Sequence, residues 1–264
     1  MSARFAGRVA LITGAGTGIG AATARRIVAE GGRVALTGRR PGPLEEVAGP
    51  LGDSALALPA DAADGPAMAA VVAQAAERFG RVDVVVANAG GHGIGAAADT
   101  TDEAWQLSLD ANLTSAFVTI REALPQLVDG GGAVVLVSSL AGLFAGPGVA
   151  GYTSTKHALV GLSRSIARDY GRHGVRANVV CPGWVRTTMA DEQMDRFAAT
   201  KGIDREAAYA LVTSNTPLGR PAEADEVAAL IAFLASPEAS IITGAVVTAD
   251  AGASAVDLPT IALV

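Results

Sequence analysis

The chain of 264 residues has little of what several functional classes require. It contains one cysteine, Cys181, so an internal disulfide and a cysteine-cluster metal site are both excluded. Its three histidines, at positions 92, 157 and 173, do not have the spacing of a histidine metal motif, and we assign no metal. Charged residues make up only 17% of the chain, and the formal net charge is −6. Because nucleic-acid-binding proteins carry a basic patch, this balance argues against a nucleic-acid partner.

Long apolar runs are also missing. No stretch of about 18 apolar residues occurs, so no membrane span is expected, and the N-terminus lacks the apolar core of a secretory signal. The 32 glycines and 12 prolines stay below the share typical of low-complexity chains. Half of the residues are apolar, which is enough for a sizeable core. These features predict a soluble, cytoplasmic protein that folds as a single domain, 1–264.

What is present is a regular alternation of short β-rich segments and longer helical ones. Runs of valine, isoleucine and leucine such as Val84-Val85-Val86 are typical of parallel strands buried on both faces. The alternation predicts an α/β fold, a doubly wound (Rossmann) parallel sheet of seven strands with helices on both faces. Strands are expected at 8–13, 33–37, 55–59, 82–87, 133–138, 175–180 and 245–248, and helices at 20–30, 65–79, 102–128, 152–170 and 224–234.

In such a sheet the ligand site lies at the carboxyl ends of the strands. Segment 187–216, which is polar and helix-prone, breaks the alternation between the sixth strand and the last helix. It is either a packed helical hairpin or a mobile substrate lid that overhangs the carboxyl edge, and we favour the lid. Two interpretations of the C-terminal tail, 253–264, stay open, namely packing on a neighbouring subunit or closure over the site.

The first predicted strand ends in a glycine-rich turn, 13–20, with the sequence Thr-Gly-Ala-Gly-Thr-Gly-Ile-Gly. Glycines let the backbone turn tightly and approach a pyrophosphate, and the following helix offers free N–H groups to the anion. The turn lacks the Gly-Lys-Ser/Thr of a P-loop, which excludes a P-loop nucleotide hydrolase. We predict a cofactor site here, and the alternative is a tight turn that binds no ligand.

The end of the second strand bears on the choice of cofactor. An NAD site places an acidic residue there to bind the ribose 2′-hydroxyl, but this chain has Gly38. Arg39 and Arg40 can instead bind a 2′-phosphate. The sequence therefore favours NADP(H), with NAD(H) as the alternative, unless the arginines are only solvated charges. Asp61 is predicted to meet the adenine, and 88–90 (Asn-Ala-Gly) to pass the adenosine side of the cofactor.

Tyr152 and Lys156 lie one helical turn apart, at positions that share a helix face. A free tyrosine has a pKa near ~10, so proton exchange near neutrality requires a drop of about 3 units, or roughly 4 kcal/mol. One cation at ~4 Å supplies about that much at an effective dielectric constant of 20. We therefore predict that Lys156 makes Tyr152 a general acid/base. The alternative is an ordinary surface pair.

Two further polar residues fit the same chemistry. Ser138-Ser139 ends the fifth strand, and the Ser139 hydroxyl can hydrogen-bond a substrate carbonyl oxygen. Asn112 interrupts a predicted helix although asparagine is a poor helix former. We expect Asn112 to hold a water that links Lys156 to bulk solvent.

Together these motifs resemble the short-chain dehydrogenase/reductase family. The glycine turn, Asn88-Ala89-Gly90, Asn112, Ser139, Tyr152-x-x-x-Lys156 and Pro182-Gly183 follow the family's order and spacing over nearly the whole chain. Two departures are Ala87, where the family often has asparagine, and Asp250-Ala251-Gly252 in place of Asp-Gly-Gly. Neither departure touches the predicted catalytic residues.

The resemblance implies roles for individual residues and an assembly. Tyr152 would be the general acid/base, Lys156 would also bind the nicotinamide ribose, Ser139 would orient the carbonyl, and Asn112 would support a proton relay. A homotetramer built on the helices 102–128 and 152–170 is implied as well. The cofactor-binding candidates are Gly14, Thr17, Gly18, Ile19, Gly20, Arg39, Arg40, Asp61, Ala62, Asn88, Ala89, Gly90, Tyr152 and Lys156, with Pro182, Gly183, Val185 and Thr187 at the carboxamide.

The predicted reaction is reversible hydride transfer between a nicotinamide cofactor and a small-molecule ketone or secondary alcohol. Residues 217–221 (Pro-Leu-Gly-Arg-Pro) resemble the 3-oxoacyl-thioester reductase branch and give a modest preference for a 3-oxoacyl or polyketide-like carbonyl. NAD-dependent alcohol, polyol and steroid dehydrogenases stay open. The predicted substrate contacts are His92, Leu140, Phe144, Trp184 and Met189, with Met194 and Phe197 as further pocket candidates; ordinary packing is the alternative for each.

Two alternatives lie outside this reaction class. A non-catalytic sensor of NADP would use the same fold, because fold does not fix function, but it has no reason to keep Asn112, Ser139, Tyr152 and Lys156 together. A methyltransferase with a Rossmann-like sheet is the other, and the Tyr-x-x-x-Lys pair argues against it.

Overall fold

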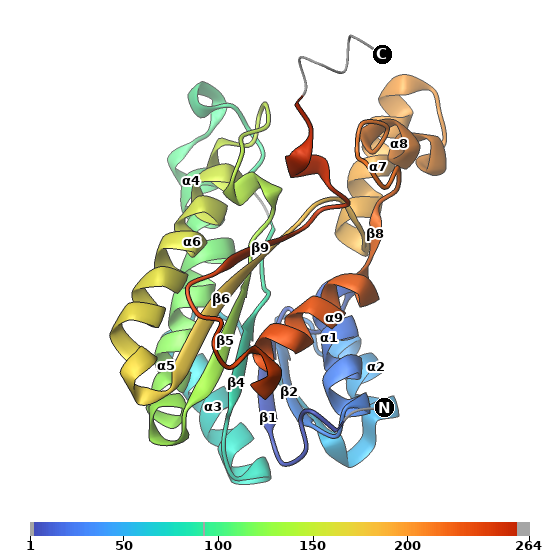
Figure 1. Ribbon diagram of the computed structural model, residues 1–264. Helices are drawn as coiled ribbons and strands as arrows, with labels where there is room; N and C mark the ends of the chain where they lie inside the picture. Colours follow the sequence, from blue (N-terminus) through green and yellow to red (C-terminus); the bar gives the residue numbers. More distant parts are fainter. Residues whose placement is uncertain (1–2, 92, 258–264) are drawn as a thin grey trace.

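The computed structural model describes residues 3–91 and 93–257. The predictions for His92 and for the tail beyond residue 257 therefore lie outside the described residues. A parallel seven-stranded sheet forms the centre of the molecule (Figure 1), in the order β3-β2-β1-β4-β5-β6-β9. Its strands are β1 Val9–Thr13, β2 Arg33–Gly38, β3 Ala55–Pro59, β4 Val84–Ala87, β5 Gly132–Val137, β6 Val175–Pro182 and β9 Val246–Ala249.

Helices cover both faces of the sheet, which confirms the predicted fold class (Figure 1). The helices α1 Gly18–Ala29, α2 Pro41–Ala48 and α9 Ala224–Ala235 pack on one face, and α3 Gly65–Phe79, α5 Ser115–Gly130 and α6 Ala150–Tyr170 on the other. Alternation in the strands explains the two cores: Val84 and Val86 point into the first layer, and Val85 points into the second. The order of the strands reverses between β1 and β4, so a crevice is expected at their carboxyl ends.

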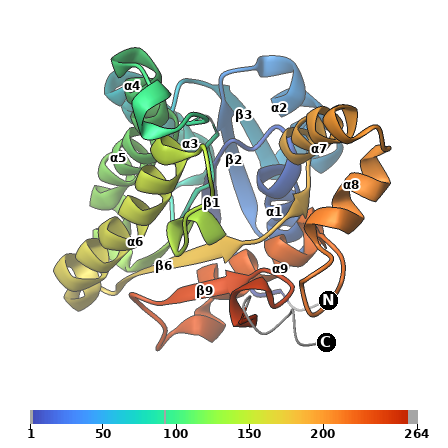
Figure 2. The ribbon, with the colours of Figure 1, turned by 90° about the horizontal axis from the view of Figure 1, so that it is seen from above.

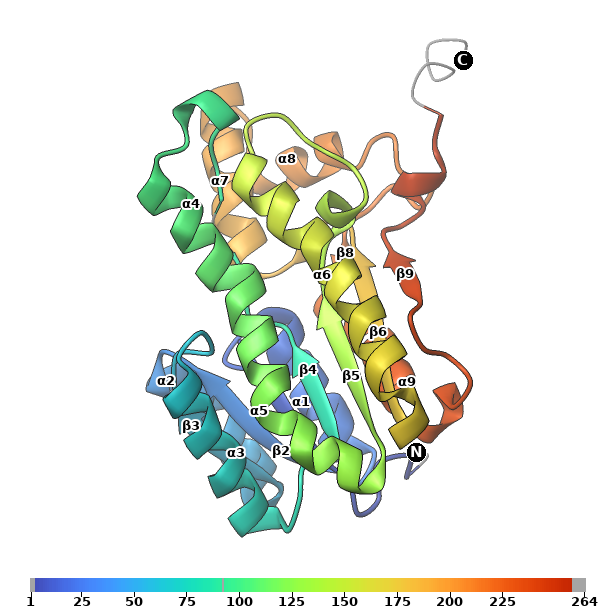
Figure 3. The same cartoon turned by 90° about the vertical axis from the view of Figure 1, so that its left-hand side faces the viewer.

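The helix expected at 102–128 is present and contains a π turn. The helix α4, Asp102–Leu109, leads through this turn, Asp110–Thr114, into α5 without a gap. Figure 3 shows α4 and α5 in succession beside α6. Asn112 lies in the π turn and is fully buried. The residue therefore marks a local irregularity of the helix, in agreement with its low helix propensity.

Segment 187–216 forms a helical hairpin at the carboxyl edge of the sheet (Figure 2), made of α7 Thr188–Lys201 and α8 Arg205–Val212. A small parallel ribbon, β7 Val185–Arg186 with β8 Ala222–Glu223, joins its two ends. The hairpin has its own core, separate from those of the sheet, in which Met194 is buried and Phe197 packs alongside. Both residues therefore contribute to the packing of the hairpin, and their place in a substrate pocket stays a prediction.

Within the described ranges, none of the helices is both long and apolar enough to span a membrane.

Candidate active site

The glycine-rich turn between β1 and α1 is packed too closely for side chains. A Cβ on Gly14, where φ is +63°, would lie 2.9 Å from Asn88 Nδ2, and one on Gly20 would lie 2.4 Å from the Gly14 oxygen. Thr17, which precedes α1, makes no side-chain capping bond to the first helical turn. The N–H groups at this helix start are therefore not capped by that side chain, and the turn fits the pyrophosphate of a dinucleotide.

Asn88 and Ala89 hold this turn in place from the end of β4. The Asn88 amide donates to the carbonyl oxygens of Thr13 (2.9 Å) and Gly14 (3.2 Å). The Thr13 hydroxyl accepts from the N–H groups of Asn88 (3.0 Å) and Ala89 (2.9 Å). The side chain of Asn88 is thus committed to the glycine turn. Gly90 lies further along, where a Cβ would be 3.0 Å from Lys156 Nζ.

The residues predicted to contact the adenosine follow the neighbouring strands β2 and β3. Arg39 and Arg40 are exposed after β2, and neither forms an ion pair with another described residue. A Cβ on Gly38 would meet only Leu44 Cδ2, at 3.8 Å. Asp61 is exposed and accepts from the Ala63 N–H at 3.0 Å, while Ala62 is buried. The two arginines therefore leave an open, positively charged edge here.

The four predicted catalytic residues come from β5, α6 and the π turn. Ser139, just after β5, is hydrogen-bonded to the half-buried Tyr152 at the start of α6. The ammonium of Lys156 lies 5.5 Å from the centre of the Tyr152 ring and donates to the Val137 oxygen at 3.0 Å. The topology thus brings the serine, the phenol and the ammonium to one place at the carboxyl edge of the sheet.

Burial dominates the electrostatics of this group. It raises the pKa of Tyr152, and the hydrogen bond from Ser139 opposes that rise. It lowers the pKa of Lys156 to about 8. Each charged form is unfavourable alone, whereas a tyrosinate beside an ammonium stabilises both. The attraction between the Tyr152 phenolate and the Lys156 ammonium, which the sequence predicts, therefore has to exceed the free-energy cost of a buried phenolate.

The buried side chain of Asn112 is fully engaged with backbone groups. Its Oδ1 accepts from the Gly91 N–H at 2.9 Å. Its Nδ2 donates to the oxygens of Gly91 (2.6 Å) and Ser108 (3.0 Å). Asn112 therefore already donates both of its amide hydrogens. A relay water near Asn112 would have to donate a hydrogen bond to an acceptor atom.

The residues expected at the nicotinamide end follow β6. A Cβ on Gly183 would lie 3.0 Å from the Asp250 Cα, so only glycine fits between the ends of β6 and β9. Val185 is buried in β7. The Thr187 hydroxyl accepts from the Ala190 N–H at 3.2 Å and caps α7. A Cβ on Gly18 would lie 2.9 Å from the Thr187 methyl group, so the hairpin begins in contact with the glycine turn.

Apolar side chains surround the same edge. Phe144 is 53% exposed, Met189 49% and Trp184 37%, and Leu140 is half-buried. They follow β5, follow β6 or open the hairpin. Met189 reaches across to the loop after β4, where a Cβ on Gly91 would meet its Cε at 3.3 Å. We call these four apolar residues the rim.

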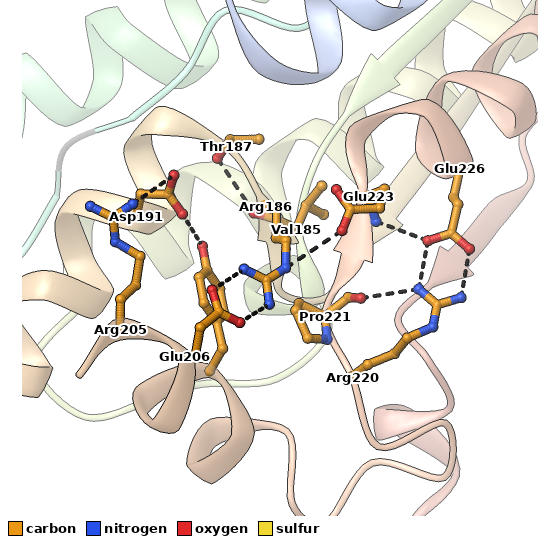
Figure 4. A network of polar contacts seen from close by, with 11 residues as sticks. Val185, Arg186, Thr187, Asp191, Arg205, Glu206, Arg220, Pro221, Glu223 and Glu226 are labelled. Atoms are coloured by element: carbon orange, nitrogen blue, oxygen red, sulfur yellow. Dashed lines mark hydrogen bonds and ion pairs between the residues drawn. The ribbon is translucent and has the colours of Figure 1, made fainter. Parts of the chain in front are cut away.

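The polar network at the base of the hairpin was not predicted (Figure 4). Arg186 of β7 binds the Glu206 carboxylate of α8 with two hydrogen bonds, at 2.7 and 2.6 Å. It also lies 3.5 Å from Glu223 of β8 and stacks 4.6 Å above the Tyr209 ring. The Tyr209 hydroxyl donates to Asp191 of α7 at 2.8 Å. The residues paired in this network are 18 or more positions apart in sequence, so no local motif predicts the network.

Comparisons with known proteins bear on the family to which the chain belongs. The sequence profile of a family described as enoyl-(acyl carrier protein) reductase matches residues 14–254. The chain is 46% identical to Protein MoaE of Klebsiella aerogenes over 97% of its length and 98% of that protein. It is 38% identical to meso-2,3-butanediol dehydrogenase of Serratia marcescens, over 96% and 97% of the two chains. The crystal structure of levodione reductase superposes with a TM-score of 0.90 at 33% identity, covering 96% of this chain and all of that one.

Proposed function

The chain belongs to the short-chain dehydrogenase/reductase family, and from this premise we propose that it is an NADP(H)-dependent reductase of apolar ketones. The family makes it an oxidoreductase that acts on alcohols and ketones. The observation that carries the proposal is the grouping of Ser139, Tyr152 and Lys156, in which the Ser139 hydroxyl contacts Tyr152 and the ammonium lies over the Tyr152 ring.

In this proposal Tyr152 handles the proton at the substrate oxygen. During reduction its hydroxyl donates a proton as the alkoxide forms, and the Ser139 hydroxyl donates a hydrogen bond to the same oxygen. Lys156 compensates the charge left on the phenolate. In the reverse direction the phenolate accepts the proton of a secondary alcohol. When bound, the nicotinamide cofactor supplies or accepts the hydride.

The residues around the glycine turn would hold that cofactor. The N–H groups at the start of α1 would bind the pyrophosphate. Residues 182–187 would contact the carboxamide, and Lys156 the ribose. The open, positively charged edge at Arg39 and Arg40 favours NADP(H) over NAD(H).

Cofactor choice is tested by Gly38→Asp. The new carboxylate has room, because a Cβ at this position meets only Leu44 at 3.8 Å. It would accept from a ribose 2′-hydroxyl and repel a 2′-phosphate, so the preference should move from NADPH towards NADH by about 100-fold or more, given two charge-dependent contacts. Steady-state kinetics with both cofactors measure this, and Gly42→Asp, at a glycine with open space around it, is the matched control. An unchanged ratio of kcat/KM values contradicts the assignment.

The uncharged apolar rim supports an apolar carbonyl substrate over a sugar. The names of two similar proteins, a butanediol dehydrogenase and a levodione reductase, refer to small neutral alcohols and ketones. Within this class a 3-oxoacyl or polyketide-like carbonyl remains our preferred substrate. We also propose that hairpin 187–216 acts as the substrate lid, because it begins at the glycine turn and reaches the loop after β4.

The decisive experiment is a screen of ketones and secondary alcohols with NADPH and NADH, followed by absorbance of the reduced nicotinamide. The wild type should turn over at least one apolar ketone. Tyr152→Phe should retain NADPH binding and lose turnover by about 1,000-fold, as expected for removal of a general acid. Equal turnover by Tyr152→Phe and wild type would refute the proposed mechanism.

A further inference from the structure

We propose that Ser138, the neighbour of Ser139, is a positioning residue that fixes Lys156 and the start of α6 against the end of β5. This inference rests on the proposed function, because it assigns a purpose to a residue that the proton transfer itself does not use. Ser138 is buried, with 4% of its surface exposed, so it does not face a substrate at the rim.

The end of β5 holds Lys156 at two atoms. The Ser138 hydroxyl donates to the main-chain oxygen of Lys156 at 2.9 Å. The main-chain oxygen of Val137, the preceding residue, accepts from Lys156 Nζ at 3.0 Å. The last residue of β5 and the residue after it therefore contact both ends of the same lysine, which fixes its backbone and its ammonium together.

The surroundings of Ser138 are closely packed. A Cβ on Gly142, in the short turn after β5, would lie 2.3 Å from Ser138 Oγ and 2.8 Å from the Lys156 oxygen. The main-chain N–H of Ser138 donates to the Val180 oxygen of β6 at 2.8 Å. Ser138 thus connects the end of β5 to both β6 and α6.

This connection matters because the catalytic residues lie on both sides of it. Ser139 follows Ser138 directly in the chain, whereas Tyr152 and Lys156 belong to α6. The hydrogen bond of Ser138 therefore sets the position of one part of the site against the other. Rates of positioned groups are sensitive to displacements of about 1 Å, which can change turnover by roughly 100-fold.

The test compares Ser138→Ala with Ser163→Ala. Both serines are buried and lie on or against α6, but Ser163 Oγ has no hydrogen-bond partner among the described residues. For Ser138→Ala we expect a loss of about tenfold in kcat with a change of less than about twofold in the KM for the ketone, as for a displacement well under 1 Å. Ser163→Ala should keep the wild-type constants.

The pH profile of alcohol oxidation supplies a readout that a merely structural role would not move. Oxidation requires the phenolate of Tyr152, so the rate rises with pH through the pKa of that group. A less firmly placed ammonium stabilises the phenolate less, and the rising limb should move to higher pH in Ser138→Ala. Ser163→Ala should leave the limb in place.

Two more variants keep the inference testable if Ser138→Ala folds poorly. Ser138→Cys retains a weak donor, so its kcat should lie between those of the wild type and Ser138→Ala. Gly142→Ala presses on the same hydroxyl and should lower kcat in the same way. The positioning role is overturned if Ser138→Ala keeps the wild-type kcat and pH profile. If Ser138→Ala does not fold, wild-type values in Ser138→Cys and Gly142→Ala overturn it. If Tyr152→Phe also keeps wild-type turnover, it is the proposed function that fails.

Discussion

At the scale of single residues, Lys156 combines a functional position with an unfavourable environment. Its side chain is almost entirely buried, and its contact with Val137 is to a neutral carbonyl oxygen. Burial lowers its pKa from 10.5 to about 8. A buried charge of this kind costs stability at neutral pH, and the proposed catalytic role of Lys156 gives a reason for keeping it.

The sign of this effect gives a prediction. Between pH 8 and 10.5 the unfolded chain binds a proton at Lys156 that the folded protein has lost, so the free energy of unfolding should rise with pH in this window. Below pH 8 the penalty is complete, and the drop in pKa corresponds to roughly 3 kcal/mol. Lys156→Met should therefore abolish turnover and raise the free energy of unfolding at pH 7 by about 1–3 kcal/mol.

Urea titrations at pH 7 and pH 9.5 measure the effect. The difference in the free energy of unfolding between Lys156→Met and the wild type should be smaller at pH 9.5, because the cost of the buried charge on Lys156 decreases there. Lys201→Met is the control, since Lys201 is exposed on α7. A variant less stable than the wild type at pH 7 would mean that the buried ammonium is stabilising.

Ala251, which stands where the family pattern has glycine, adopts a backbone conformation that favours glycine. Among the described residues it is the one non-glycine residue with positive φ, at 56°. An alanine pays about 1 kcal/mol or more in this region, while glycine adopts it freely. Ala251→Gly should therefore raise the free energy of unfolding by about 0.5–1 kcal/mol, after the greater freedom of the unfolded glycine is subtracted.

Thermal unfolding of Ala251→Gly beside Ala253→Gly checks this prediction. Ala253 lies in the same loop without a positive φ, so glycine there should lower stability. If both variants lose stability, the backbone at Ala251 is not strained.

At the scale of elements, the hairpin proposed as a lid is held together at its base, where the ribbon of β7 and β8 lies. Arg186 connects the entering strand β7 to α8 and to the returning strand β8, and Tyr209 connects α8 to α7 (Figure 4). Because the hairpin also has its own core, α7 and α8 should move as one body about this base.

Glu206→Gln tests this arrangement. The carboxylate is exposed, so the loss of its ion pair should change the free energy of unfolding by less than about 1 kcal/mol. The closed position should nevertheless become less favourable, which we expect to raise the substrate KM by about 3- to 5-fold without lowering kcat. Glu192→Gln, with the same loss of charge at another exposed position of the hairpin, should keep the wild-type KM. Equal substrate KM values for Glu206→Gln and Glu192→Gln would contradict a role of the Arg186–Glu206 ion pair in holding the hairpin closed.

The sequence predicted the elements whose signal is local. All seven strands of the sheet were placed within two residues at every end, because buried parallel strands are continuous apolar runs. The helical stretch at 102–128 was placed, but the π turn within it was not predicted, since the bonds of Asn112 to Gly91 form only in the tertiary structure. The two-residue strands β7 and β8 were missed because they pair only when the hairpin returns.

The same distinction applies to the site. The glycine turn and the Tyr152–Lys156 pair are short motifs, so they could be found without coordinates. The role of Asn88 as a clamp on the glycine turn, and that of Arg186 at the base of the hairpin, depend on partners that fold from distant segments. These two roles could therefore not be predicted from the sequence.

At the scale of the whole molecule, three large apolar side chains on α4 and α5 are exposed. Trp105 is 40% exposed, Leu107 47% and Phe117 46%. The two helices follow each other along one side of the molecule (Figure 3). Exposed apolar groups of this size are typical of interfaces between subunits. This face agrees with the homotetramer that the family resemblance implies, which we keep as a prediction.

Phe117→Glu tests the assembly, because a charge in the centre of an apolar contact has to be desolvated without a partner. In the monomer the side chain is half exposed beside Arg121, so the substitution should leave the fold intact. Light scattering after size exclusion should give about four chain masses for the wild type and fewer for the variant. Leu211→Glu, an equally exposed position on α8, should keep the wild-type mass. Since α5 continues from the turn that holds Asn112, turnover should fall with the mass in Phe117→Glu alone. A monomeric wild type, or a tetrameric Phe117→Glu, would remove α4 and α5 from the interface.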